Sequence, residues 1–143
     1  MKGYTLLLLL GLATLACAWT PFEFNTQHDM IEYMRDEDHH VYILYFYDSG
    51  NKGNYDAKVV HKEREAIKAN GLEKYSDVYY KEFDVKDNAY EFVTHTLGLE
   101  TADVAEYPTV VAVSDGIGKW INGPNLSQLL VPTLNAIMRN KAQ

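Results

Sequence analysis

The side chains that could carry chemistry in this 143-residue chain are few, and their spacing does not suit catalysis. Cys17 is the one cysteine, so the chain can form neither an internal disulfide nor a zinc site built from several cysteines. No serine lies in a Gly-x-Ser-x-Gly elbow. The adjacent histidines His39 and His40 would point to opposite faces of a strand, which makes a poor metal chelate. We therefore expect a chain that is not an enzyme, with no catalytic residue, no metal site and no cofactor.

The charge balance argues against one class of partner. The chain has 13 Lys and Arg against 20 Asp and Glu, which gives a formal net charge of −7. Nucleic-acid backbones are held mainly by clustered basic side chains, so we expect no nucleic-acid partner. Hydrophobic residues make up 47% of the chain, which is enough for the packed core of a single domain.

Residues 1–18 have the layout of a secretory signal peptide. Lys2 supplies a positive charge, 6–15 is a mostly apolar run, and Ala16-Cys17-Ala18 matches the small-residue cleavage pattern. Cleavage before Trp19 would remove the cysteine and leave residues 19–143 as the mature domain. The alternative is a retained membrane anchor, although a spanning helix needs about 20 apolar residues. We expect membrane contact only if this segment is retained.

From Trp19 onward, the hydrophobic pattern predicts one domain in which helices alternate with strands. The run from His40 to Tyr47 is apolar on both faces, which is typical of a central strand covered on both sides. Thr26 and Asp29 should cap the first helix, and Pro132 should either kink the last helix or mark its first turn. Strands are expected at 22–24, 40–47, 78–85, 109–113 and 119–121, and helices at 26–35, 55–69 and 88–97. A break at Asn122-Gly123-Pro124 should precede a last helix that ends near Asn140. This order predicts an α/β fold, a mixed central sheet with helices on both faces.

The segment that opens the fourth predicted strand is the most specific feature of the sequence. Tyr107-Pro108-Thr109 leads into an apolar run, and Asp115-Gly116, Trp120 and Gly123 follow before the final helix. This arrangement resembles the second half of a thioredoxin domain. The resemblance covers most of the chain after the leader, and it implies the thioredoxin-like fold. It also implies a cis bond between Tyr107 and Pro108, beside the active site of that family.

The first half of the resemblance bears on redox chemistry. In active thioredoxins, a Cys-x-x-Cys motif stands at the start of the helix that follows the central strand. In this sequence Asn51-Lys52-Gly53-Asn54 occupies the corresponding place. A thiolate is the attacking species in disulfide exchange, and an asparagine amide cannot replace it. We therefore expect this chain to be redox-inactive.

These observations predict a redox-inactive thioredoxin-like domain that binds or scaffolds another protein in the secretory pathway, in the ER lumen or outside the cell. Such a domain resembles the non-catalytic domains of protein disulfide isomerases. The alternative is a structural accessory subunit of a membrane protein complex, for instance in the mitochondrial inner membrane, held by an uncleaved N-terminal helix. The resemblance implies a partner-binding groove lined by Asn51, Lys52, Gly53, Asn54, Tyr55, Tyr107 and Pro108.

One further motif concerns modification rather than binding. Asn125-Leu126-Ser127 is an N-glycosylation sequon. Asparagine is also a favoured residue at the start of a helix, so Asn125 could equally cap the last helix. The sequence alone leaves both roles open.

Overall fold

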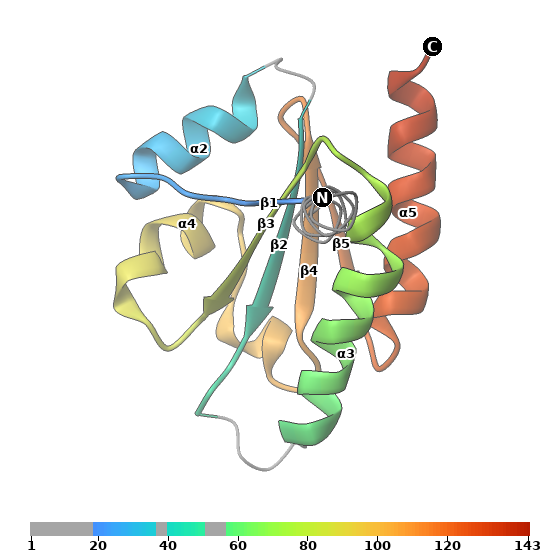
Figure 1. Cartoon of the computed structure of the whole chain (residues 1–143). Coiled ribbons are helices and arrows are strands. Elements are labelled where there is room, and N and C mark those ends of the chain that lie inside the picture. Colours follow the sequence, from blue (N-terminus) through green and yellow to red (C-terminus); the bar gives the residue numbers. More distant parts are fainter. Residues whose placement is uncertain (1–18, 37–39, 51–56) are drawn as a thin grey trace, which may run out of the picture.

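The computed structural model describes residues 19–36, 40–50 and 57–143, which form a five-stranded mixed sheet with helices on both sides (Figure 1). The strand order across the sheet is β1-β3-β2-β4-β5. Strands β1, β3 and β2 run parallel, whereas β4 is antiparallel to β2 and β5 is antiparallel to β4. The strands are β1 Thr20–Pro21, β2 Val41–Tyr47, β3 Val78–Asp84, β4 Thr109–Ser114 and β5 Ile117–Asn122.

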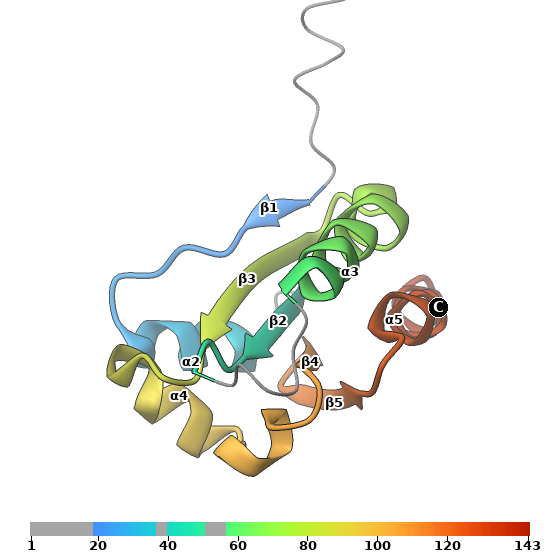
Figure 2. The same cartoon turned by 90° about the horizontal axis from the view of Figure 1, so that it is seen from below.

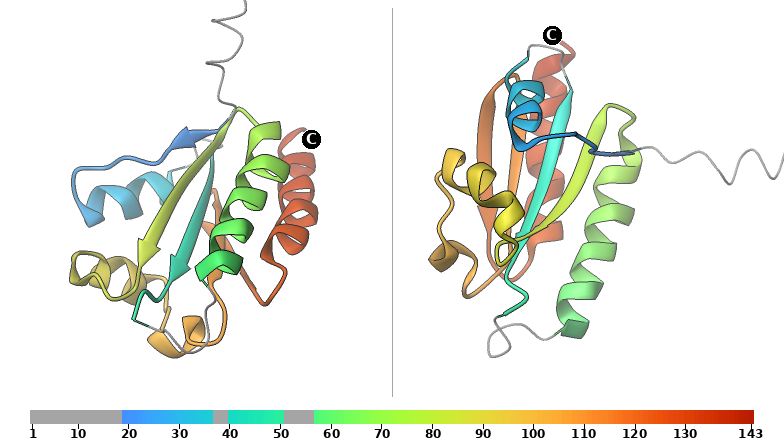
Figure 3. Two further views of the ribbon diagram at one scale, coloured as in Figure 1. Left: turned by 60° about the horizontal axis from the view of Figure 1, so that its bottom comes forward. Right: turned by 90° about the vertical axis from the view of Figure 1, so that its left-hand side faces the viewer.

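The helices form two layers, one on each face of the sheet. Helices α2 and α4 cover one face, and α3 and α5 cover the other, as the view from below shows (Figure 2). Helices α3 and α5 contact each other and lie side by side (Figure 3). The predicted α/β class is therefore confirmed. The helices are α2 Gln27–Arg35, α3 Ala57–Asn70, α4 Glu91–Thr96 and α5 Leu126–Lys141, with 3-10 turns at Leu72–Lys74, Asn88–Tyr90 and Thr101–Val104.

Strand β2 lies at the centre of the sheet and contributes to both hydrophobic layers. Successive side chains of a strand point to opposite faces. On this strand, Tyr42, Leu44 and Phe46 pack toward α2 and α4, and the residues between them pack toward α3 and α5. From position 41 to position 46 the side chains are at most 3% exposed. The prediction of a central strand covered on both faces is confirmed.

The first strand is displaced from its predicted position. It was expected at 22–24, but it pairs with β3 only at Thr20 and Pro21. The Phe22 N–H still donates to the Tyr80 carbonyl at 2.8 Å. The Phe22 ring is then buried against Tyr42, with 4.7 Å between the ring centroids. Burying this ring turns the chain away from the sheet edge toward α2.

Local capping explains how two of the helices begin. Thr26 Oγ1 accepts from the Asp29 N–H, and an Asp29 carboxylate oxygen accepts from the Thr26 N–H, both at 3.1 Å. This reciprocal pair is the capping box that the sequence predicts for α2. The helix expected at 88–97 instead begins as a 3-10 turn, because the Asp87 carboxylate accepts from the Ala89 N–H. The α-helical part starts only at Glu91.

Strand β5 is longer than expected, and the position of Pro132 in α5 is settled. Asp115 and Gly116 have φ values of 51° and 74°, which suit the tight turn of a two-residue hairpin. The turn allows β5 to pair with β4 from Ile117 to Asn122 rather than only at 119–121. Pro132 lies inside α5, seven residues into the helix, so it does not mark the first turn.

No helix in the described ranges is both long enough and apolar enough to cross a bilayer.

Candidate functional site

The carboxyl end of β2 is where the sheet brings the two predicted groove segments together. Strand β2 pairs with β4 so that Phe46 lies opposite Thr109. The loop that follows β2 and the segment that precedes β4 therefore leave the sheet at the same end, which lies at the bottom of Figure 1. Asn51, Lys52, Gly53, Asn54 and Tyr55 lie outside the described residues, so the site is defined by its remaining parts.

Two carboxylates hold the loop after β2. Asp48 is 6% exposed, and its Oδ1 accepts from the Gly50 N–H at 2.8 Å, while its Oδ2 lies 3.8 Å from Lys86 Nζ. From the neighbouring strand β3, Asp84 Oδ1 accepts from the backbone N–H groups of Ser49 and Lys86 at 3.2 and 3.1 Å. Residues 48–50 are thus tied to the end of β3 through both their backbone and the buried Asp48 side chain.

The electrostatics of this loop favour a charged Asp84. Partial burial of Asp84 works against ionisation, but the hydrogen bonds from Ser49 and Lys86 and the charge of Lys86 outweigh it. The pKa of Asp84 is therefore lowered, and the carboxylate is ionised at neutral pH. A Cβ at position 50 would lie 2.9 Å from Lys86 Cε, so a larger residue than Gly50 would push the lysine away from Asp48.

A second polar network holds the segment before β4. The Asn122 amide donates to the carbonyls of Asp103 and Tyr107 at 3.0 and 3.3 Å, and to Thr109 Oγ1 at 2.7 Å. The Thr109 hydroxyl, which is 1% exposed, donates in turn to the Asp103 carbonyl. Sequence analysis missed Asn122 because its role depends on three acceptors that come together only in the folded chain.

The structure corrects one expectation about Tyr107 and Pro108. The bond between them is trans, since no cis peptide bond occurs in the described part of the chain, so the predicted cis bond is wrong for this structure. The prediction rested on the resemblance alone, and trans is the preferred isomer of an X-Pro bond. Pro108 is also buried and Tyr107 half-buried, and the Tyr107 carbonyl already accepts from Asn122. The Tyr107 carbonyl is therefore part of the network that holds the segment before β4.

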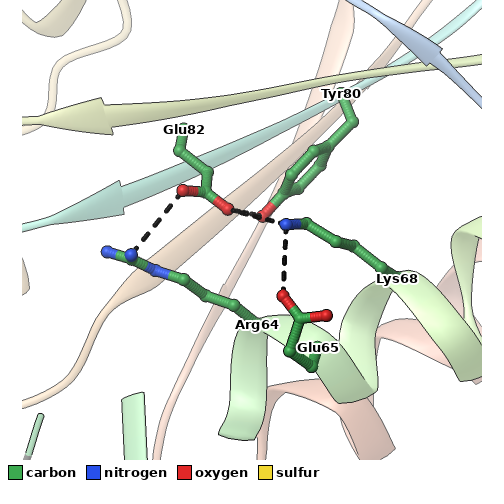
Figure 4. Close-up of polar contacts among 5 residues, drawn as sticks. All are labelled: Arg64, Glu65, Lys68, Tyr80 and Glu82. Atoms are coloured by element: carbon green, nitrogen blue, oxygen red, sulfur yellow. Dashed lines mark hydrogen bonds and ion pairs between the residues drawn. The ribbon is translucent and has the colours of Figure 1, made fainter. Parts of the chain in front are cut away.

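A third polar cluster, between α3 and β3, was not predicted (Figure 4). Glu82 of β3 lies 3.6 Å from Arg64 and 3.5 Å from Lys68, and it accepts from the Tyr80 hydroxyl at 3.1 Å. The guanidinium carbon of Arg64 also lies 4.1 Å from the ring centroid of Tyr47. The available signal was the spacing of Arg64 and Lys68, four residues apart on one face of a helix.

The protonation states in this cluster suit a structural cross-link. Burial raises the pKa of Tyr80 far above its usual value, and the charge and hydrogen bond of Glu82 add to the effect. Burial opposes the charge of Arg64, but attraction from Glu82 and the interactions with Tyr45 and Tyr47 outweigh it, so the pKa of Arg64 is raised. The phenol stays neutral and the guanidinium charged across the neutral range, so neither is poised to exchange a proton.

The remaining predicted positions are separate from these networks. Within residues 19–36, 40–50 and 57–143, no three His, Cys, Asp or Glu side chains are placed to share a metal ion. The His40 ring packs against Tyr79, with 5.0 Å between centroids. Asn125 is exposed and occupies the N-cap position of α5, as the alternative role expects, but its side chain makes no capping hydrogen bond.

Comparison with known proteins relates the chain to one fold. No protein-family model matches the sequence, and no curated protein matches it. Among solved structures, a thioredoxin from Trypanosoma brucei brucei aligns with a TM-score of 0.57 and 17% identity, covering 87% of this chain and 96% of that one. Thioredoxin O2 from Arabidopsis thaliana, in the oxidized state, aligns with a TM-score of 0.52 and 15% identity, covering 87% and 94% of the two chains. At these identities, the likeness concerns the fold alone.

Proposed function

We propose that this chain, which has the thioredoxin-like fold, is a redox-inactive domain of the secretory pathway that binds another protein at the carboxyl end of β2. The observation that carries the proposal is the pair of polar networks around that end of the sheet. The carboxylates of Asp48 and Asp84 hold one loop, and Asn122 holds the segment opposite. Together they hold residues 48–50 and the segment before β4 in place at that end of the sheet.

The absence of a dithiol supports a binding role over a redox role. Disulfide exchange through a mixed disulfide requires an attacking thiolate, and a reusable catalyst also needs a second thiol to resolve it. The sequence has one cysteine, Cys17, and it lies in the segment with the signal-peptide layout. Asn51 and Asn54 stand where the resemblance would place the two thiols.

Preorganisation supports the placement of the binding surface. A partner that docks on a loop already held in one conformation avoids the entropic cost of ordering it. Tyrosine is enriched at protein interfaces because it combines a large apolar ring with a polar tip. Tyr107 is half-buried, lies two residues before β4 at the same end of the sheet, and supplies the aromatic anchor of the proposed surface.

The binding site is tested by measuring the affinity of the protein for a partner isolated from native material. Tyr107→Ala should weaken binding by at least about 1 kcal/mol, roughly fivefold in Kd, without changing the fold. The matched control is Tyr33→Ala, which removes a 43% exposed tyrosine on α2, near the amino end of β2. Wild-type affinity in a folded Tyr107→Ala protein would exclude this surface as the binding site.

The redox assignment is tested by an insulin-reduction assay. The purified protein should reduce insulin no faster than the dithiol reductant alone. The double variant Asn51→Cys/Asn54→Cys supplies the thiols that the resemblance places there and serves as a gain-of-function comparison. Turnover by the unaltered chain above background would contradict the assignment.

The cellular location is tested by N-terminal sequencing of the native protein. Trp19 as the first residue would agree with signal-peptide cleavage and delivery to the secretory pathway. An intact N-terminus starting at Met1, with recovery in a membrane complex, would instead favour an anchored accessory subunit.

A further inference from the structure

We infer that Asn125 is an N-glycosylation site, occupied when the chain enters the secretory lumen. The inference rests on the secretory location in the proposed function. Asn125-Leu126-Ser127 is the only Asn-x-Ser/Thr sequon in the sequence, so the protein would carry either one N-linked glycan or none. Attached glycans are bulky and solvated, so an acceptor asparagine must lie at the surface of the folded protein. Asn125 meets this requirement, since its side chain is exposed between β5 and α5.

The first turn of α5 explains why this asparagine is free for modification. A capping side chain usually accepts from the N–H of the second or third helical residue. In α5 the second helical residue is Ser127, and its N–H donates instead to Glu63 Oε1 of helix α3, at 2.5 Å. The Asn125 side chain makes no capping hydrogen bond, and only its backbone carbonyl serves the helix, accepting from Leu129. A glycan on the Asn125 amide would therefore break no hydrogen bond of the helix start.

The chemistry is a group transfer to the side-chain amide. The donor is an oligosaccharide linked to a lipid through a pyrophosphate. A bond forms between the sugar C1 and Asn125 Nδ2, the bond between C1 and the pyrophosphate oxygen breaks, and the lipid pyrophosphate leaves. The amide nitrogen loses one proton to a base of the transferase. No electron transfer is involved, and the chain contributes only the acceptor.

The packing of the sequon indicates when the transfer takes place. Leu126 is 1% exposed, and the Ser127 N–H is held by Glu63, so both residues after Asn125 are fixed in the folded domain. A transferase that must surround all three residues of the motif would have to unwind the start of α5. Modification therefore precedes the docking of α5 on α3, during translocation of the chain.

The glycan would also cover an exposed apolar side chain. Leu129 is 46% exposed and lies one helical turn after Asn125. A solvated sugar attached at position 125 would shield this leucine from other chains. We expect the unglycosylated protein to be less soluble than the glycosylated one at equal concentration.

The inference is tested by expressing the full chain in eukaryotic cells and treating the product with a peptide-N-glycosidase. The wild-type protein should shift to higher mobility by the mass of one glycan. Asn125→Gln and Ser127→Ala should abolish the shift, and Ser127→Thr should keep it. Asn140→Gln is the matched control, because it alters an exposed asparagine of the same helix that lies outside the sequon. Protease protection in intact microsomes reports, separately, whether the chain is lumenal.

Each possible result of these two measurements either supports or overturns glycosylation at Asn125. A lumenal chain with a shift that Asn125→Gln removes would support the inference. A lumenal chain without a shift would overturn it and leave the secretory location standing. A chain that remains outside the lumen would overturn both. A stability measurement on unglycosylated protein from bacteria tests the structural argument separately. Asn125→Gln should leave the unfolding midpoint unchanged, whereas Glu63→Ala should lower it. The reverse result would show that the Asn125 side chain caps α5 and would remove the argument that its amide is free.

Discussion

The two faces of the sheet are filled in different ways. On the face covered by α2 and α4, aromatic rings from several elements contact one another: Phe46 and Phe83 are stacked with centroids 5.0 Å apart, and Phe83 meets Tyr90 edge-on at 4.8 Å. On the face covered by α3 and α5, the buried layer consists largely of aliphatic side chains such as Ile67, Leu130 and Leu134. The two layers share the same sheet and even the same strand β2.

The difference follows from the lengths of the covering helices. Helices α2 and α4 have 9 and 6 residues, whereas α3 and α5 have 14 and 16. Short helices contribute few side chains, so large rings from the strands and loops must occupy the space beside them. Long helices pack rows of aliphatic side chains against the sheet, and α3 also places Arg64 and Lys68 beside Glu82 of β3.

The cations on both faces lie near aromatic rings, but only those on the second face, Arg64 and Lys68, also pair with a carboxylate among the described contacts. The ammonium of Lys81 lies 5.4 to 5.8 Å from the ring centroids of Phe24, Phe83 and Tyr90 on the aromatic face. On the aliphatic face, Arg64 and Lys68 both lie near the Glu82 carboxylate. An aromatic ring attracts a cation weakly and with little directional preference, whereas a carboxylate attracts it more strongly and fixes its position.

The largest expected effect is loss of an aromatic ring from the first face. Phe83→Ala should destabilise the protein by about 3–5 kcal/mol, because it leaves a cavity and removes several ring contacts. Leu134→Ala, on the other face, should cost about 2–5 kcal/mol, from the cavity alone. The free energy of unfolding is measured by denaturant titration. A cost below about 1 kcal/mol for Phe83→Ala would show that the aromatic face is loosely packed.

The second prediction concerns the Tyr80 hydroxyl and alkaline stability. Tyr80→Phe should cost about 1.5 kcal/mol at neutral pH through the lost hydrogen bond to Glu82. The folded pKa of Tyr80 is raised above the ordinary value of 10.0, so its contribution is complete below pH 10 and is lost as pH rises further. The advantage of the wild type over Tyr80→Phe should therefore shrink by about 1.4 kcal/mol per pH unit above 10. A difference that stays constant from pH 8 to 11 would contradict the raised pKa.

A smaller effect is expected for the stacking of Arg64. Arg64→Lys keeps the charge beside Glu82 but loses the planar contact with the Tyr47 ring. The expected cost is about 0.5–1 kcal/mol. A double-mutant cycle with Tyr47→Leu isolates the pair, and its coupling energy should fall in the same range. Zero coupling would mean that Arg64 acts through Glu82 alone.

The smallest effect is expected at Asp84, the last residue of strand β3, next to the loops at that end of the sheet. Asp84→Asn keeps the acceptor oxygen but removes the charge, and because the group is partly exposed the cost at pH 7 should be about 0.5 kcal/mol. The folded pKa of Asp84 is lowered below 3.8, so this stability is present above that pH and is lost as pH falls through the folded pKa. Unfolding curves of the two proteins should therefore converge in acid. Divergence at low pH would contradict the assignment.

Much of the fold could be predicted from local patterns. The apolar run of β2, the Thr26–Asp29 capping box and the Asp115-Gly116 turn each depend on residues close together in the sequence. The boundaries of β1 and α4 could not be predicted in this way. The boundary of β1 depends on the contact between Phe22 and Tyr42, and the start of α4 depends on the 3-10 turn that Asp87 caps. Both interactions compete with the hydrophobic pattern from which the boundaries were predicted.

The sequence by itself determined the alternation of strands and helices, the single cysteine and the sequon at Asn125. The reason is that periodicity and composition are properties of the linear chain. Only the tertiary structure decided that Asn122 holds Tyr107, that Glu82 joins two cations of α3, and that Glu63 rather than Asn125 serves the first turn of α5. Each of these contacts joins residues 14 or more positions apart. No local pattern encodes such distances, because the packing of whole elements sets them.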